Sequence, residues 1–158
     1  MERRNFLKAV AVGAGSVVSA GGLSFGQEYF PVEVDKDLWK GINRVKNPEN
    51  ETILEKLHVP VITAPNEVKA GEVFDVNVLV GRVPHPMGPS HWIEYLQLSI
   101  GNEPAGTVTF RSHGYLKAQA KFAVVLDEQL KGKNISLVAT LTCNLHGMWQ
   151  HHLNIQVV

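Results

Sequence analysis

Alternating hydrophobic and polar residues fill the second half of the chain. The segment "VFDVNVLV" (73–80) places Phe74 and three valines on one face, with Asp75 and Asn77 on the other. This period of two is typical of a strand with one buried face. The same criterion predicts seven strands, at residues 59–62, 73–80, 92–100, 107–110, 116–126, 135–142 and 153–158.

Turn-forming residues separate the predicted strands, among them Ala70-Gly71 and Lys131-Gly132-Lys133. Seven short strands in about 100 residues predict an all-β fold, a seven-stranded antiparallel immunoglobulin-like β-sandwich. Such a sandwich indicates no function by itself, because functional residues sit in its loops.

The first 20 residues have the character of an export signal. Arg3 and Arg4 precede a short apolar stretch, and Val18-Ser19-Ala20 offers a small-residue cleavage site. This pattern resembles a twin-arginine signal, with Glu2 where Ser or Thr is commoner. The apolar run is too short to span a bilayer comfortably. We therefore expect a signal peptide over residues 1–20 and a periplasmic protein with no membrane association after cleavage.

Residues 21–51 show little alternation and are expected to form a leader or linker before one domain over residues 52–158. Near the end of this linker, Asn47, Pro48 and Asn50 mark a turn. The following segment "ETILEKL" is expected to make a short helical turn. His58 would then stand at the head of the first strand.

Composition narrows the classes of function. The 158 residues include 15 Lys plus Arg and 15 Asp plus Glu, so the formal net charge is zero. Composition therefore gives no electrostatic case for a nucleic-acid partner. Cys143 is the only cysteine. A single thiol excludes an intrachain disulfide and any zinc or iron site that needs four cysteines from one chain.

That cysteine lies in "TCNLHGMWQHH" (142–152). The alternation through 135–141 puts Cys143 on the core side at the end of a strand. A buried free cysteine is commonly a small hydrophobic residue, and for Cys143 alone this interpretation stays open. His146, three residues later, allows one loop to offer sulfur and nitrogen to the same metal ion. Gly147 permits a sharp reversal behind the histidine.

A second group of histidines lies in "PHPMGPSH" (84–91), where His85 and His91 share a loop. Three prolines exclude a helix there and leave the loop little freedom. Either histidine alone would be interpreted as a surface residue. Two histidines on one rigid loop, together with the C-x-x-H segment, favour a metal site.

Four segments together resemble the landmark segments of the superoxide reductases, the iron family that includes neelaredoxin and desulfoferrodoxin. They are "EKLHVPVI", "VPHPMGPSH", "TFRSHG" and "CNLHGMW", and they occur in the family's order over about residues 52–158. The resemblance implies one mononuclear non-haem iron per chain. Two-iron members of the family carry an additional four-cysteine domain, so this sequence resembles the one-iron type.

The resemblance also implies the ligand set. Four equatorial histidines and one axial cysteine thiolate would bind the iron, namely His58, His85, His91, His146 and Cys143. His113 matches a family position that is not a ligand and is interpreted as structural. His151 and His152 lie outside the motifs and are expected to be exposed or second-sphere residues.

The implied activity is the one-electron reduction of superoxide to hydrogen peroxide. An external electron donor, rubredoxin-like or cytochrome-like, would reduce the iron again. Relatives of this type are commonly homotetramers, so the resemblance implies a homo-oligomer.

The sequence departs from the family in the first segment, where the usual order is Glu-Lys-His. Here the order is Glu55-Lys56-Leu57-His58. Lys56, one residue further back, is the candidate for attracting superoxide and helping to supply protons. The alternative is that Lys56 is a solvated surface lysine. The sequence also leaves open whether Glu55 can act as a sixth ligand.

Two other classes of function remain open from the sequence. Cys143, His85, His146 and an axial Met148 would imitate a type 1 copper electron-transfer site on a β-sandwich, although two histidines are then unexplained. The segments "APNEVKAGEVFDV" and "HPM" resemble exported sulfur-carrier sandwich proteins. Those carriers hold their thiol on a flexible C-terminal arm, whereas Cys143 precedes a predicted strand.

Overall fold

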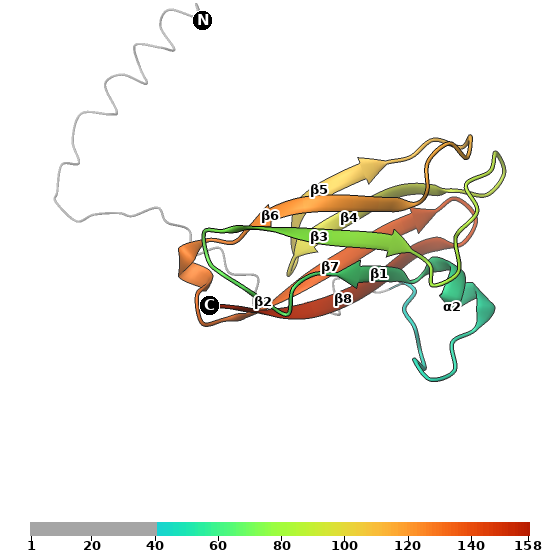
Figure 1. Cartoon of the computed structure of the whole chain (residues 1–158). Coiled ribbons are helices and arrows are strands. Elements are labelled where there is room, and N and C mark those ends of the chain that lie inside the picture. The colour runs from blue at the N-terminus through green and yellow to red at the C-terminus, as the bar shows by residue number, and fades with distance from the viewer. Residues whose placement is uncertain (1–40) are drawn as a thin grey trace, which may run out of the picture.

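The computed structural model describes residues 41–158. The expected signal peptide (1–20) and most of the expected leader (21–51) therefore lie outside the described residues. Within residues 41–158 the chain folds into two stacked β-sheets with one short α-helix at one end (Figure 1). No helix in this described range is long and apolar enough to cross a membrane.

Eight strands, one α-helix and one 3₁₀ turn make up the fold of residues 41–158. In chain order they are α2 (Ile53–His58), β1 (Pro60–Thr63), β2 (Glu67–Val68), β3 (Val73–Val80), β4 (Ile93–Ile100), β5 (Glu103–Thr109), β6 (Gln119–Val125), η1 (Glu128–Leu130), β7 (Asn134–Cys143) and β8 (Gly147–Val157). One sheet has the strand order β1-β3-β6, and the other has the order β2-β8-β7-β4-β5. The named strands pair antiparallel, except that β2 pairs in parallel with β8.

The predicted all-β sandwich is confirmed, with an eighth strand that the sequence did not reveal. β2 has only two residues, too few to display an alternation. β5 begins at Glu103 rather than at residue 107, and its first part contains Pro104 and Gly106. Both residue types are uncommon inside strands, and Pro is tolerated here because β5 is an edge strand.

The larger difference concerns the last strand, which begins at Gly147 and not at residue 153. Polar residues at 150–152 interrupt the alternation, so the first half of β8 was not predicted. Cys143 pairs with Gly147 across β7 and β8, so the C-x-x-H segment forms a tight hairpin. Gly147 has a φ of 71°, which confirms the reversal expected at this glycine.

The core lies between the two sheets and follows the alternation seen in the sequence. Val76, Val78 and Val80 of β3 are at most 1% exposed, and so are the inward-facing residues of β7, including Cys143. Burying one aliphatic side chain contributes roughly 1.5–3 kcal/mol, so the core supplies most of the stability. The end loops are therefore available for function.

The expected helical turn forms as α2, but the prediction that His58 begins a strand is wrong. His58 is the last residue of α2, and β1 starts two residues later at Pro60. Thr52 caps the helix because its Oγ1 accepts a hydrogen bond from the Glu55 backbone N–H at 3.2 Å. The Glu55 side chain accepts from the Thr52 backbone N–H in return, which completes a capping box.

The last residues of the expected linker pack against the sandwich. Asn43 forms a parallel bridge with Trp149 of β8, and the Arg44 guanidinium donates to the Gln150 side-chain oxygen at 2.6 and 3.1 Å. The turn expected near Pro48 is present, since the Asn50 N–H donates to the Asn47 carbonyl at 3.1 Å.

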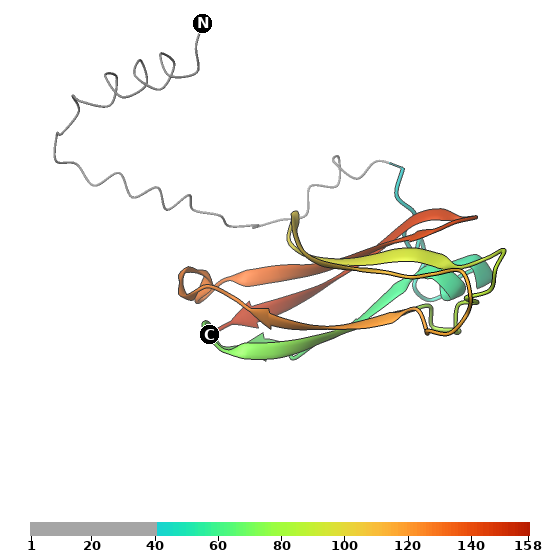
Figure 2. The ribbon, with the colours of Figure 1, turned by 90° about the horizontal axis from the view of Figure 1, so that it is seen from above.

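Three segments that are far apart in the sequence meet at one end of the sandwich. They are α2, the loop between β3 and β4, and the hairpin between β7 and β8, as both views show (Figures 1 and 2). These are the segments that carry the predicted ligands. The fold therefore brings the candidate site together at the ends of strands.

Candidate metal centre

Four imidazole rings and one thiol converge at this end of the sandwich. The ligand atoms of His58, His85, His91 and Cys143 all lie within 4.8 Å of one another. His146 joins them, because its Nδ1 lies 3.1 Å from Nε2 of His58 and 3.2 Å from Nε2 of His91. The structure thus brings together all five residues that the sequence singled out as metal ligands.

The four rings form a closed cycle of edge-to-face contacts. The ring centroids are 4.7 Å apart for His58 and His85, 4.5 Å for His85 and His91, 4.9 Å for His91 and His146, and 4.7 Å for His146 and His58. The planes of neighbouring rings meet at 72–75°. The inward nitrogen is Nε2 in three rings and Nδ1 in His146.

The spacing of these nitrogens suits one metal ion. Histidine nitrogens bind divalent metals at about 2.1 Å, so neighbouring donors at right angles lie about 3.0 Å apart. The nitrogens of His58 and His85 are 3.1 Å apart, and those of His91 and His146 are 3.2 Å apart. The donor set therefore fits a single ion surrounded by four imidazoles.

Cys143 places its sulfur beside this cycle. Its Sγ lies 3.2 Å from Nε2 of His91 and 3.6 Å from Nδ1 of His146. The residue is 1% exposed at the end of β7, as the alternation predicted. A thiol buried in this way is poorly placed to exchange sulfur with a large partner, which argues against the sulfur-carrier interpretation.

Two of the histidines are fixed in the tautomer that leaves Nε2 free to bind a metal ion. Nδ1 of His58 lies 2.7 Å from the Leu54 carbonyl oxygen, and Nδ1 of His85 lies 2.6 Å from the Pro86 carbonyl oxygen. A carbonyl only accepts, so each Nδ1 carries the proton and each Nε2 presents a lone pair to the centre of the cycle.

Burial favours the uncharged form of the His58, His85 and His91 rings. It lowers the pKa of His58 and of His91, and it lowers the pKa of His85 to about 4, where repulsion from a charged His58 adds to the effect. A metal binds the neutral imidazole, so the folded protein holds these side chains in the required state at neutral pH.

Trp149 contacts the ring of His58 and the backbone of His146, a role that the sequence did not reveal. Its indole lies parallel to the His58 ring, with 5.1 Å between centroids and 20° between planes. Its Nε1 donates to the His146 carbonyl at 3.1 Å. The tryptophan was visible in the "CNLHGMW" segment, but nothing in the alternation indicated contact with a helix far earlier in the chain.

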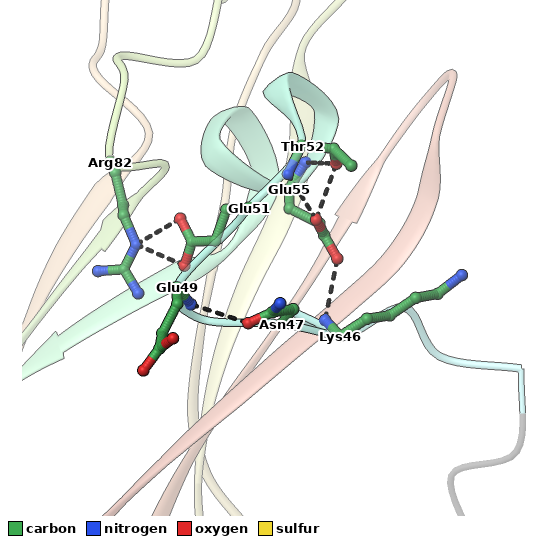
Figure 3. A network of polar contacts seen from close by, with 7 residues as sticks. All are labelled: Lys46, Asn47, Glu49, Glu51, Thr52, Glu55 and Arg82. Carbon is green, nitrogen blue, oxygen red and sulfur yellow. Dashed lines mark hydrogen bonds and ion pairs between the residues drawn. The ribbon is translucent and has the colours of Figure 1, made fainter.

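Arg82 joins the helix to the loop that follows β3. Its Nε lies 2.8 Å from both carboxylate oxygens of Glu51, just before α2 (Figure 3). Its backbone N–H donates to the Lys56 carbonyl at 2.7 Å. Arg82 therefore holds the loop that carries His85 against both ends of the helix that carries His58.

Glu55 is committed to the helix cap. Its Oε2 accepts from the Thr52 N–H at 2.7 Å and from the Thr52 hydroxyl at 2.8 Å, and its Oε1 accepts from the Lys46 N–H at 2.9 Å (Figure 3). The bond from the Thr52 N–H, followed by that from Lys46, lowers the pKa of this carboxyl group. Both oxygens are occupied, so Glu55 is not placed as a sixth ligand.

Lys56 is exposed on α2, two residues before His58. Successive residues of a helix are about 100° apart, so Lys56 leaves the helix on nearly the opposite side from His58. Its role in attracting superoxide stays a prediction.

The remaining histidines lie outside the cluster, as expected for residues that were not predicted to be ligands. His113 is exposed, with its ring 6.4 Å from that of Tyr115. On β8, His151 is half-buried and His152 is exposed. Burial lowers the pKa of His151.

The arrangement defines a class of protein, a β-sandwich that binds one metal ion through imidazoles and a thiolate at one end. The family model for desulfoferrodoxin matches residues 49–152. The chain therefore belongs to the desulfoferrodoxin family. The copper interpretation is not supported, because the cluster includes His58 and His91, which a type 1 copper site would leave out.

Individual proteins show the same relationship. A relative from Methanocaldococcus jannaschii is 36% identical over 115 residues, which cover 73% of this chain and 93% of that one. The superoxide reductase of Thermococcus kodakarensis is 33% identical over 106 residues, which cover 63% of this chain and 87% of that one. The solved superoxide reductase (neelaredoxin) from Ignicoccus hospitalis superposes with a TM-score of 0.62 at 34% identity, over 74% of this chain and 95% of that chain.

Proposed function

We propose that this protein is an oxidoreductase that reduces superoxide by one electron to hydrogen peroxide at one iron ion. The observation that carries the proposal is the closed cycle of four imidazoles with the Cys143 sulfur beside it. The net reaction takes one superoxide, one electron and two protons to one hydrogen peroxide. The electron comes from an external donor.

The protein's own part is to hold the ion and set its surroundings. His58, His85, His91, His146 and Cys143 would bind the iron, which supplies a one-electron couple made more electron-rich by the thiolate. These five side chains would hold the ion, and superoxide would be the small anion that reacts there. Burial lowers the pKa of His58 and of His85, so these two imidazoles bring no charge of their own to the donor set.

The stoichiometry of the products tests the reaction. A reductase forms one hydrogen peroxide for each superoxide consumed and forms no dioxygen, whereas a dismutase forms one for every two. We expect one iron per chain. With a chemical reductant as the electron donor, we expect one hydrogen peroxide formed for each superoxide consumed, and this activity should be lost in Cys143→Ala. Copper in the purified protein, or a ratio of one half with release of dioxygen, would contradict the proposal.

We propose further that the chain is exported to the periplasm by the twin-arginine pathway and is re-reduced there by a rubredoxin-like or cytochrome-like protein. The paired arginines followed by an apolar run support the export. The resemblance to one-iron relatives supports a homo-oligomer, which we propose to be a tetramer. Size-exclusion chromatography with light scattering measures the oligomeric state directly.

A further inference from the structure

We propose that Asn144 is a positioning residue for the metal site, and that its side-chain amide holds His91 beside Cys143. The inference deepens the proposed function, because it rests on metal binding at the same site. It is carried by hydrogen bonds that the Asn144 amide makes to both neighbours of His91.

The first bond extends the sheet beyond its regular end. Cys143 pairs with Ile93 across β7 and β4, so the next pair along is Asn144 with Trp92. The Asn144 backbone N–H donates to the Trp92 carbonyl at 3.2 Å, as a regular ladder requires. The return bond is different, because the Trp92 N–H donates to the side-chain Oδ1 of Asn144 at 2.9 Å.

This substitution of a side-chain oxygen for a backbone carbonyl frees the chain to turn. The Asn144 carbonyl is not needed for the ladder, so the backbone can leave the strand directly after Cys143 and enter the hairpin that carries His146. The pairing at Trp92 is nevertheless kept. The thiol and the second donor of the C-x-x-H segment can therefore reach the same ion.

The second bond holds the residue that precedes His91. The Nδ2 of Asn144 donates to the Ser90 carbonyl at 2.9 Å. Ser90 and Trp92 are the chain neighbours of His91, so one amide group holds the backbone on both sides of this ligand. The His91 Nε2 lies 3.2 Å from the Cys143 sulfur, whose own residue is bonded covalently to Asn144.

His91 needs this support more than the other histidines in the upstream segments do. His58 and His85 each have a backbone carbonyl at Nδ1 and are at most 7% exposed. His91 is only partly buried, and among residues 41–158 its ring makes no such bond to a carbonyl. Its orientation therefore depends on how firmly its backbone is held.

Only an amide of this length satisfies both partners. The Trp92 N–H needs an acceptor, and the Ser90 carbonyl needs a donor. Aspartate keeps the acceptor but turns a second carboxylate oxygen toward the Ser90 carbonyl. Alanine loses both bonds. The two substitutions therefore separate the bond to Trp92 from the bond to Ser90.

Cobalt(II) titration of the metal-free protein tests the proposal without any assay of superoxide. The thiolate-to-cobalt absorption reports whether Cys143 binds, and the titration gives the affinity. Loss of an outer partner of a metal ligand typically weakens metal affinity by about 10–100-fold. We expect a loss in this range for Asn144→Ala and a smaller one for Asn144→Asp. Asn154→Ala is the matched control, since Asn154 accepts a hydrogen bond from Ser136 elsewhere on the same hairpin, and its affinity should equal that of the parent.

A double-mutant cycle with His91→Ala shows whether Asn144 acts through His91. If it does, Asn144→Ala weakens cobalt binding much less when His91 is already absent. An equal loss in both backgrounds, or no loss in either, overturns the inference. If Asn144→Ala does not fold, the cycle is run with Asn144→Asp. Failure of the parent protein to bind cobalt through Cys143 would instead overturn the proposed function.

Discussion

The indole ring of Trp149 lies parallel to the imidazole of His58, with 5.1 Å between the ring centroids. The same indole donates to the carbonyl of His146, so one side chain touches two neighbouring members of the histidine cycle. Trp149 is 3% exposed, which means that its ring is also part of the core. The metal site is thus continuous with the hydrophobic interior on this side.

Substitution of Trp149 should separate its packing role from its hydrogen bond. Trp149→Phe keeps an aromatic ring beside His58 but loses the hydrogen bond to the His146 carbonyl. A neutral hydrogen bond of this kind contributes about 1 kcal/mol to the free energy of unfolding. Trp149→Ala loses the ring as well and should destabilise the fold by about 3–5 kcal/mol. Urea unfolding of both metal-free variants measures these changes. Equal stability of the Phe and Ala variants would mean that the ring does not pack as described.

The Glu55 carboxylate should contribute to the helix cap and not to the metal. Thr52→Ala removes the capping hydroxyl and is expected to cost about 1 kcal/mol of stability. Glu55→Gln should also lower the unfolding midpoint, because it weakens the bonds to Thr52 and Lys46. The absorption spectrum of the iron-loaded, oxidised protein should stay that of the parent in both variants. A spectral change confined to Glu55→Gln would identify Glu55 as a ligand.

Much of the fold could be predicted because the core alternation is strong. Val76 and Val78 face inward with the polar Asn77 between them, and the same period of two placed Cys143 on the buried face of β7. β8 was predicted only in its second half, since its inner residues there are apolar while His151 and His152 are not. His151 lies on the same face of β8 as the core residues Trp149 and Ile155, so a polar residue on the inward face broke the alternation that periodicity depends on.

The five residues that cluster at the end of the sandwich could be singled out from motifs, but their geometry could not. Spacing in the sequence does not tell that His58 ends a helix or that His146 offers Nδ1 where the others offer Nε2. These features depend on contacts between distant segments, such as the hydrogen bonds of Arg82 to Glu51 and Lys56. Local propensity cannot encode such contacts.

The metal-free protein should lose stability as the pH falls below neutral. Burial lowers the pKa of folded His85 to about 4, whereas an unfolded histidine titrates near 6.5. Between these values the unfolded chain binds more protons, so the free energy of unfolding rises with pH and falls on acidification. Urea unfolding at pH 7, 5.5 and 4 should show this slope, and His85→Gln should reduce it. An unchanged slope in His85→Gln would assign the effect to other groups.

Export should depend on the guanidinium groups of the first residues. Replacing Arg3 and Arg4 together by lysine keeps the positive charge but changes the hydrogen-bonding geometry, because a lysine ammonium lacks the planar fork of donors of an arginine guanidinium. We expect the doubly substituted precursor to stay in the cytoplasm, while Lys8→Arg as a control is exported normally. Fractionation of cells followed by immunoblotting measures the distribution. Continued export of the Lys-Lys protein at the parent level would contradict the twin-arginine assignment.

Lys56 should raise the rate with superoxide if its exposed side chain, carried by a flexible four-carbon stem, reaches the open side of the site. Attraction of a small anion by a positive side chain weakens steeply with ionic strength. Lys56→Ala should therefore lower the second-order rate constant several-fold at low salt and flatten its dependence on salt, with iron content unchanged. Lys131→Ala is the matched control, because Lys131 is an exposed lysine beside η1, away from α2. Pulse radiolysis at several salt concentrations measures both rates. Identical salt slopes for the parent and both variants would mean that Lys56 does not attract superoxide and that the charge of the metal itself does.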